Sequence, residues 1–86
     1  MKAKLIILTP VFNDWKNLDK LLTKINKLFY YKIKQKFDLI IVDDNSTEKI
    51  NFSKSKFRKI NDVKILKNRS NLGSQRSIAI GLRYIK

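Results

Sequence analysis

Short apolar runs that alternate with a helical pattern place the strongest constraint on this chain. Residues 3–9 and 37–42 are mostly apolar, with β-branched centres, as is typical of strands buried on both faces of a sheet. Between them, apolar side chains recur at the spacing of an amphipathic helix, at positions 15, 18, 21, 22, 25, 28 and 29. We expect Pro10 to end the first strand, Asn13 or Asp14 to cap the helix, and residues 32–36 to form a polar connection.

The second part of the chain continues this alternation. Residues 62–66 predict a third strand, and a weak apolar pattern in residues 48–61 predicts a short helix. After a polar loop at 68–73, Ile78, Leu82 and Ile85 predict a closing helix from about Ser74. Strands that alternate with helices pair in parallel through right-handed crossovers. The sequence therefore predicts an α/β fold, a three-layer parallel sheet with alternating helices.

The composition excludes several chemistries. The chain has 86 residues, enough for one small domain, and it has no Cys and no His. Disulfides, the usual zinc sites, Ser-His-Asp and Cys-His nucleophiles and a histidine base are all excluded. The longest uninterrupted apolar run, Leu5–Leu8, is too short to span a membrane, and no cleavable leader precedes it. We therefore expect a cytoplasmic, non-spanning segment.

The net charge is strongly positive, at +13, from 20 Lys and Arg against 7 Asp and Glu. Such a surplus is compatible with a basic module that binds nucleic acid, or with an anionic membrane face. However, 16 of the cations are Lys spread along the chain, whereas phosphate-binding surfaces favour clustered Arg. A solvated lysine-rich surface explains the charge better, and nucleic acid is an unlikely partner.

Polar residues follow each predicted strand, at 9–14, 43–47 and 67–73. Ligands of parallel α/β sheets bind outside the carboxyl ends of the strands, so these segments are the candidate site. Asp43 and Asp44 are adjacent there, and their mutual repulsion needs a cation or hydrogen-bond donors. One option is a metal ion. In another, one carboxylate accepts from the chain and the other from a bound base. The third is that both cap the next helix together with Ser46.

Two further positions in these segments leave alternatives open. Phe12 could cover the first helical turn or offer its flat face to a planar ligand. Gly73 permits a positive φ angle or the close approach of a phosphate to a helix N-terminus, where Arg69 and Arg76 could neutralise charge. The chain contains neither Gly-x-Gly-x-x-Gly nor a Gly-Lys-Ser/Thr loop, so the sequence does not support a dinucleotide or P-loop site.

Three segments together resemble the N-terminal half of the family 2 glycosyltransferases, inverting enzymes of the GT-A fold that use nucleotide sugars. They are Ile-Leu-Thr-Pro-Val-Phe-Asn-Asp at 7–14, Leu-Ile-Ile-Val-Asp-Asp-Asn-Ser-Thr at 39–47, and Asn-Arg-Ser-Asn-Leu-Gly-Ser-Gln-Arg-Ser-Ile-Ala-Ile-Gly-Leu at 68–82. The last segment is similar to the branch that includes polyprenyl-phosphate sugar transferases. Ala79 departs from the pattern, since many members carry Asn there.

The resemblance implies a nucleotide-binding Rossmann-like half and a role for several residues. Pro10 and Phe12 would line the base pocket, and Asp14 would reach toward the ribose. Asp44 would accept the N–H of the base, while Asp43 would support the loop. The helix entered through Gly73 would pack beneath the sugar-diphosphate site. The implied substrate-binding residues are therefore Pro10, Phe12, Asp14, Asp43, Asp44 and Gly73.

The resemblance also implies partners and a cofactor. The donor would be a UDP- or GDP-sugar and the acceptor a polyprenyl phosphate or a glycan, with the inner face of the membrane as a location. Mg²⁺ or Mn²⁺ would be held by an Asp-x-Asp motif in the next strand, which residues 1–86 lack. We therefore expect residues 1–86 to be the donor-binding part of a glycosyltransferase, truncated before that strand, without catalytic or metal-ligating residues and inactive alone.

A receiver domain is another alternative, because Ile-Val-Asp-Asp also ends its first strand and binds Mg²⁺ there. In this chain a full strand and helix precede Asp43, and no Asp follows Asp62 to serve as phosphoacceptor. These departures make a receiver-like α/β domain the weaker interpretation.

Overall fold

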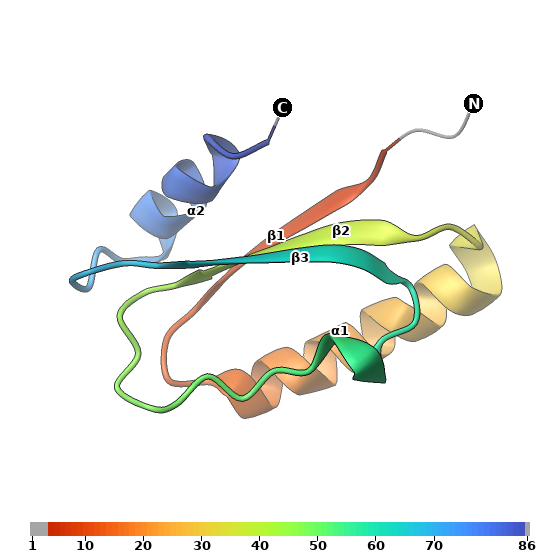
Figure 1. Ribbon diagram of the computed structural model, residues 1–86, viewed down its shortest axis with the longest axis horizontal. Coiled ribbons are helices and arrows are strands. Elements are labelled where there is room, and N and C mark those ends of the chain that lie inside the picture. Colours follow the sequence, from red (N-terminus) through yellow and green to blue (C-terminus); the bar gives the residue numbers. More distant parts are fainter. Residues whose placement is uncertain (1–3, 86) are drawn as a thin grey trace.

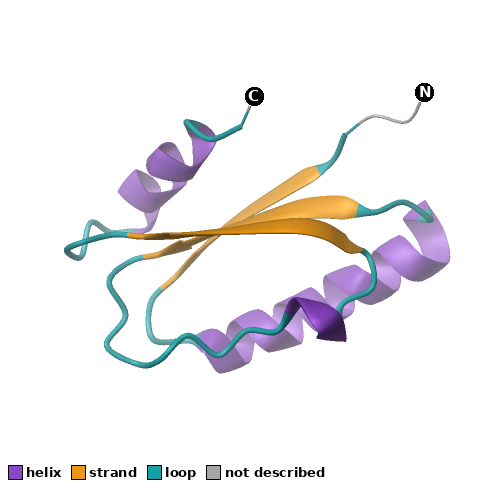
Figure 2. Ribbon diagram, viewed as in Figure 1, coloured by secondary structure: helices purple, strands orange, loops and turns teal. Residues whose placement is uncertain are grey.

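Three parallel strands, in the order β1–β2–β3, form a sheet with helices on both faces (Figures 1 and 2). The computed structural model describes residues 4–85. Its elements are β1 (Ile6–Val11), α1 (Trp15–Leu28), the π-helical turn η1 (Phe29–Ile33), β2 (Phe37–Asp43), the 3₁₀ turn η2 (Lys54–Lys56), β3 (Ile60–Lys67) and α2 (Ser74–Leu82). The predicted three-layer parallel α/β fold is confirmed. Residue 3, assigned to the first strand from sequence, lies outside the described residues.

The sequence predicted that the first strand ends at Pro10, and this prediction was wrong. Pro10 lies inside β1, paired with Val42, and the strand continues to Val11. The backbone N–H of Asp44 donates to the carbonyl oxygen of Val11 at 2.8 Å, so Pro10, one residue earlier, directs its backbone away from β2. Because β1 is an edge strand, the missing N–H of Pro10 costs no ladder hydrogen bond.

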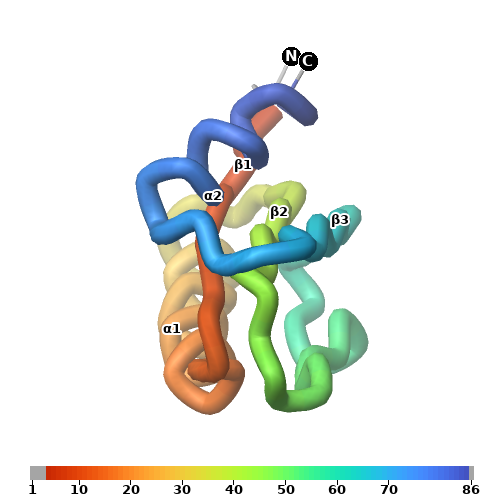
Figure 3. The backbone as a smooth tube through the Cα atoms, turned by 90° about the vertical axis from the view of Figure 1, so that its left-hand side faces the viewer, coloured from red at the N-terminus to blue at the C-terminus, as the bar shows by residue number. Residues whose placement is uncertain are grey.

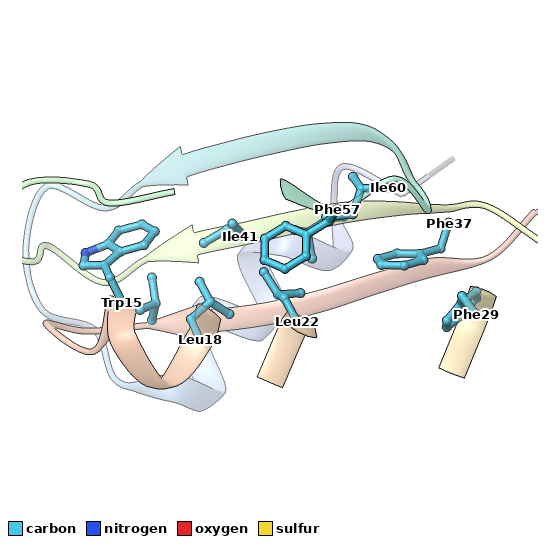
Figure 4. Close-up of a cluster of buried hydrophobic side chains, with 10 residues drawn as sticks. Trp15, Leu18, Leu22, Phe29, Phe37, Ile41, Phe57 and Ile60 are labelled. Carbon is cyan, nitrogen blue, oxygen red and sulfur yellow. The ribbon is translucent and has the colours of Figure 1, made fainter. Parts of the chain in front are cut away.

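The main hydrophobic core lies between α1 and the sheet. Trp15, Leu18 and Leu22 of α1 face the odd-numbered residues of β2, and Phe57 and Ile60 close the core (Figure 4). Two leucines predicted for the buried stripe, Leu21 and Leu28, are instead each 48% exposed. The buried face of α1 is therefore narrower than its sequence pattern indicates.

The opposite face of the sheet is covered by α2. Its buried residues are Ser77 and Gly81, and a Cβ atom at Gly81 would collide with Leu8 Cδ1 and lie 3.0 Å from Val42 Cγ2. Because Leu8 and Val42 point away from α1, α2 forms the third layer. The sequence pattern had placed Ile85 in this helix, but α2 ends at Leu82.

The connection from β2 to β3 is mostly loop, so the helix predicted for residues 48–61 was wrong. Only the single turn η2 forms there. The apolar residues behind the prediction do not share a helical face, because Ile50 is exposed while Phe52 and Phe57 stack with ring centroids 6.1 Å apart. Conversely, α1 continues into η1, and the chain turns at Lys34, whose φ is 56°.

None of the helices within residues 4–85 combines the length and the apolar character that crossing a bilayer requires.

Candidate functional site

The loops that follow the three strands meet at one edge of the sheet, which Figure 3 faces. We call residues 12–14, 44–48 and 68–73 the carboxyl edge. Backbone hydrogen bonds continue the sheet into it. The N–H of Asp44 donates to the carbonyl of Val11, and the N–H of Asn68 donates to the carbonyl of Asp43, each at 2.8 Å. The predicted site segments are therefore neighbours in space, as parallel pairing requires.

The side chain of Asp44 accepts three hydrogen bonds at this edge. Its Oδ1 accepts from Leu72 N at 2.7 Å and from Asn68 Nδ2 at 3.0 Å, and its Oδ2 accepts from Gly73 N at 2.9 Å. The Leu72 amide, helped by Asn68, Gly73 and Ser77, holds the pKa of Asp44 below its ordinary value, although burial opposes the shift. The carboxylate is therefore ionised at neutral pH. A carboxylate has about four acceptor positions, and the chain's own donors use most of those of Asp44.

The same network fixes the start of α2. Asn68 Nδ2 also lies 3.0 Å from Ser77 Oγ, within a wholly buried part of the helix. Gly73 has a φ of 88° and a ψ of 160°, a conformation that favours glycine, and this conformation aims its N–H at Asp44. Asp44 and the N-terminus of α2 are therefore held together as one unit.

Asp43 points to the other face of the sheet. Its Oδ1 accepts from Ser46 N at 2.9 Å, which supports the loop after β2. Its Oδ2 lies 3.9 Å from Lys67 Nζ and, like Trp15 Nε1, is buried without a hydrogen-bond partner among the described residues. The two adjacent carboxylates thus avoid repulsion by diverging. No helix follows them directly for them to cap, which removes one of the three alternatives.

The carboxylate pair does not form a metal centre. Asp43 and Asp44 diverge, and most acceptor positions of Asp44 are used by the chain's own donors. Within residues 4–85, no group of three or more acidic, His or Cys side chains is arranged to hold an ion. The residues present do not fit the Mg²⁺ or Mn²⁺ that the family resemblance implies.

Three predicted residues line a shallow hollow of about 280 Å³ beside β1. Pro10, Phe12 and Asp14 form its wall together with Leu21 of α1. Phe12 is 49% exposed, so about half of its side chain is open to solvent, and it lines the hollow together with Leu18 in the first turns of α1. Asp14 takes the N-cap position but makes no side-chain cap. Its Oδ2 instead accepts from Asn17 Nδ2 at 3.1 Å.

Asn13 is a structural residue that the sequence suggested only as a helix cap. Its Oδ1 accepts from Thr47 N at 2.8 Å and Glu48 N at 3.0 Å, and its own N–H donates to Ser46 Oγ at 2.9 Å. Its φ of 49° is one that asparagine tolerates well. An asparagine after a strand indicates a turn or a cap, but the local sequence could not identify the distant residues to which Asn13 bonds.

The predicted residues therefore form two adjoining groups. Pro10, Phe12 and Asp14 line the hollow, while Asp44 and Gly73 are hydrogen-bonded to each other on the neighbouring loops. Asp43 lies beneath the surface on the α1 side and is fully buried. A ligand at this edge would meet an exposed aromatic ring, an ionised acceptor and a helix N-terminus.

Comparison with known proteins agrees with this architecture. The model of the family "Glycosyl transferase family 2" matches residues 6–86. No curated protein and no solved structure matched the chain. The chain belongs to glycosyl transferase family 2, and its parallel α/β sheet is that of part of a GT-A, Rossmann-like half. The resemblance inferred from the three sequence segments is confirmed, and the receiver-like interpretation is set aside.

Proposed function

We propose that the carboxyl edge binds the nucleoside diphosphate of a sugar donor for glycosyl transfer. The observation that carries the proposal is Asp44, an ionised carboxylate whose backbone N–H bonds to Val11, so that it lies on the loop beside the exposed Phe12. An ionised carboxylate can only accept hydrogen bonds. It therefore favours a base with a ring N–H, such as uracil or guanine, while Phe12 supplies a stacking face.

The remaining groups suit the other parts of such a donor. Asp14, at the rim of the hollow, would accept a ribose hydroxyl, and Pro10 would form the wall of the base pocket. The diphosphate would lie beside the start of α2, where guanidinium groups can offset its charge, because the N–H of Gly73 already donates to Asp44. Arg69 and Arg76 flank this point and are exposed. Asp43 supports the loop after β2 rather than touching the ligand.

Donor binding, not transfer, is the activity we assign to residues 6–86. Transfer needs the leaving diphosphate to be stabilised and the acceptor hydroxyl to be activated by a base. The described residues hold no metal-ligand cluster, and the buried Asp43 and Asp44 are engaged in the fold. The acceptor would be a polyprenyl phosphate or a glycan, and we assign no acceptor site to the described residues.

Isothermal titration of the 86-residue chain with UDP, GDP and pyrophosphate tests the proposal. One nucleotide should bind at least about tenfold more tightly than pyrophosphate, because the base adds a stacking and a hydrogen-bond contribution. Phe12→Ala should weaken nucleotide binding by about tenfold. Tyr31→Ala is the matched control, since Tyr31 is an exposed aromatic residue in η1, beyond the far end of α1. Equal affinity for pyrophosphate and both nucleotides would reject the base pocket.

A further inference from the structure

Two segments of the chain carry many cations and no acidic residue. Residues 20–37 contain six Lys, and residues 49–61 contain four Lys and Arg58, so that together they hold 11 of the 20 cations. Carboxylates that line the other end of the sheet, Asp14, Asp43, Asp44 and Glu48, lie outside both segments. The positive charge, which appeared evenly spread in the sequence, is therefore unevenly distributed relative to the acids.

The fold brings these two segments together. Lys59 N donates to Asn26 Oδ1 at 3.0 Å, Phe37 N donates to Lys59 O at 2.9 Å, and Lys59 Nζ lies 5.6 Å from the Tyr30 ring centroid. We call residues 27–36 and 54–59 the basic pole. Figure 1 shows η1 at the end of the molecule opposite to the loops of the carboxyl edge. Two neighbouring acids are engaged in ion pairs, Asp19 with Lys56 and Asp38 with Lys4, whereas a third, Asp62, is exposed.

The basic pole also exposes apolar and aromatic side chains. Four large side chains between residues 28 and 33 are 41% to 66% exposed: Leu28, Tyr30, Tyr31 and Ile33. Phe29, between them, is buried and packs on Phe37 with ring centroids 4.5 Å apart, so η1 is anchored while its other side chains face outward. A hollow of about 340 Å³ beside Tyr30 and Tyr31 is lined by Lys27 and Arg58, which leaves room for an anionic headgroup.

We propose that the basic pole binds the surface of a bilayer that contains anionic phospholipids. Lysine stems and tyrosine rings suit a membrane interface, because each has an apolar body and a polar tip. Cations near an anionic leaflet are attracted by its surface potential. The occupant is a lipid surface rather than nucleic acid because seven of the eight cations of the pole are Lys, and because exposed Leu28 and Ile33 gain nothing from a phosphate backbone.

Binding at the pole would leave the carboxyl edge open. The molecule is 38 Å long, and the strands run along this axis from the pole to the carboxyl edge (Figure 1). A bilayer at one end therefore does not occlude the loops at the other. The membrane proposal is thus independent of the proposed donor site, and each can fail without the other.

Vesicle co-sedimentation tests the proposal directly. The 86-residue chain is mixed with vesicles of phosphatidylcholine alone, or of phosphatidylcholine with phosphatidylserine. We expect the partition coefficient to be at least about tenfold higher for the anionic vesicles and to fall with added salt. Equal partition into both vesicle types, or none into either, would overturn the proposal.

Matched variants locate the surface. Lys27→Gln with Lys32→Gln should lower partition by about tenfold, whereas Lys64→Gln with Arg83→Gln removes the same charge outside the pole and should lower it less than about threefold. All four side chains are exposed, so thermal melts should show an intact fold for both variants. If the two pairs lower partition equally, net charge alone drives binding and the pole has no special role.

The aromatic residues separate a lipid surface from other occupants. Tyr30→Ser with Tyr31→Ser should lower vesicle partition by at least about tenfold without changing affinity for duplex DNA, because only the bilayer interface takes up the rings. Unchanged vesicle partition with these substitutions would contradict a role of the rings at a lipid surface. Loss of a dimer on size-exclusion chromatography with the same variant would instead identify the pole as an interface between copies of the chain.

Discussion

Asp44 and Gly73 are joined by a 2.9 Å hydrogen bond from the glycine N–H to the carboxylate Oδ2, which ties the end of β2 to the first turn of α2. The bond crosses between loops that are 29 residues apart in the chain. Among the described residues, Gly73 is the only glycine with a positive φ angle, and this conformation directs its N–H toward Asp44. The carboxylate to which we assign donor binding therefore also holds the start of α2 in place.

Replacing Asp44 with Ala should destabilise the protein by about 2–3 kcal/mol, because three donors lose a charged acceptor and two of them are main-chain groups. Urea unfolding measures the change. Hydrogen exchange should also show faster exchange at the amides of Leu72 and Gly73. Asp62→Ala provides the control, since Asp62 is an exposed carboxylate on β3 and should change stability by less than about 0.5 kcal/mol.

Stability should depend on pH through Asp44. Its pKa in the folded protein lies below the ordinary value of 3.8, chiefly because the Leu72 amide favours the charged form. The stabilisation is therefore complete above the pKa of the unfolded chain and is lost as the pH falls through the lower pKa of the folded state. Below about pH 4, unfolding free energy should decrease more steeply in the wild type than in Asp44→Ala. If the unfolding free energies of the wild type and Asp44→Ala fall equally as the pH decreases, Asp44 does not cause the pH dependence.

Asn13 should be replaceable by Asp but not by Ala. The Oδ1 of Asn13 accepts from the amides of Thr47 and Glu48, and an Asp side chain would keep both hydrogen bonds. Asn13→Ala should cost about 1–2 kcal/mol and expose both amides to faster exchange. Asn13→Asp should stay within about 1 kcal/mol of the wild type. A similar loss in both variants would indicate that the φ of 49°, rather than the oxygen, governs this position.

Gly81 should not tolerate a side chain. A methyl group there would press into Leu8 and Val42, which lie in the sheet beneath α2. Gly81→Ala should destabilise the protein by about 1–3 kcal/mol, although Ala is a better helix former than Gly. Gln75→Ala, at an exposed position of the same helix, is the control and should change stability by less than about 0.5 kcal/mol. Stabilisation by Gly81→Ala would mean that α2 does not pack on the sheet at this position.

The helices and strands that were predicted correctly are those in which apolar side chains recur at a regular spacing. The run of Leu39 to Val42 is buried on both faces in the structure, and the stripe from Trp15 to Leu22 packs on the sheet, because burial enforces both patterns. Residues 48–61 lacked such repetition. Their apolar side chains enter the core from a loop through Phe57, an arrangement that has no periodic signature.

The candidate site was partly predictable for a similar reason. Parallel pairing alone brings the loops after the strands together, so Phe12, Asp44 and Gly73 could be assigned to one edge from sequence. The divergence of Asp43 from Asp44 also follows from alternation along a strand. By contrast, the contacts of Asn13 with Thr47 and Glu48 join positions more than 30 residues apart. They depend on how the two loops dock, which no local pattern encodes.

Amide chemical-shift mapping of the 86-residue chain during titration with UDP or GDP is the most direct measurement of the central claim. We predict saturable shifts at the amides of Phe12, Asp44 and Gly73, much smaller shifts with pyrophosphate at Phe12, and none at Tyr31 of the basic pole. Shifts confined to residues 27–36 and 54–59, or no saturable shift at the carboxyl edge with either nucleotide, would contradict the assignment of the donor site.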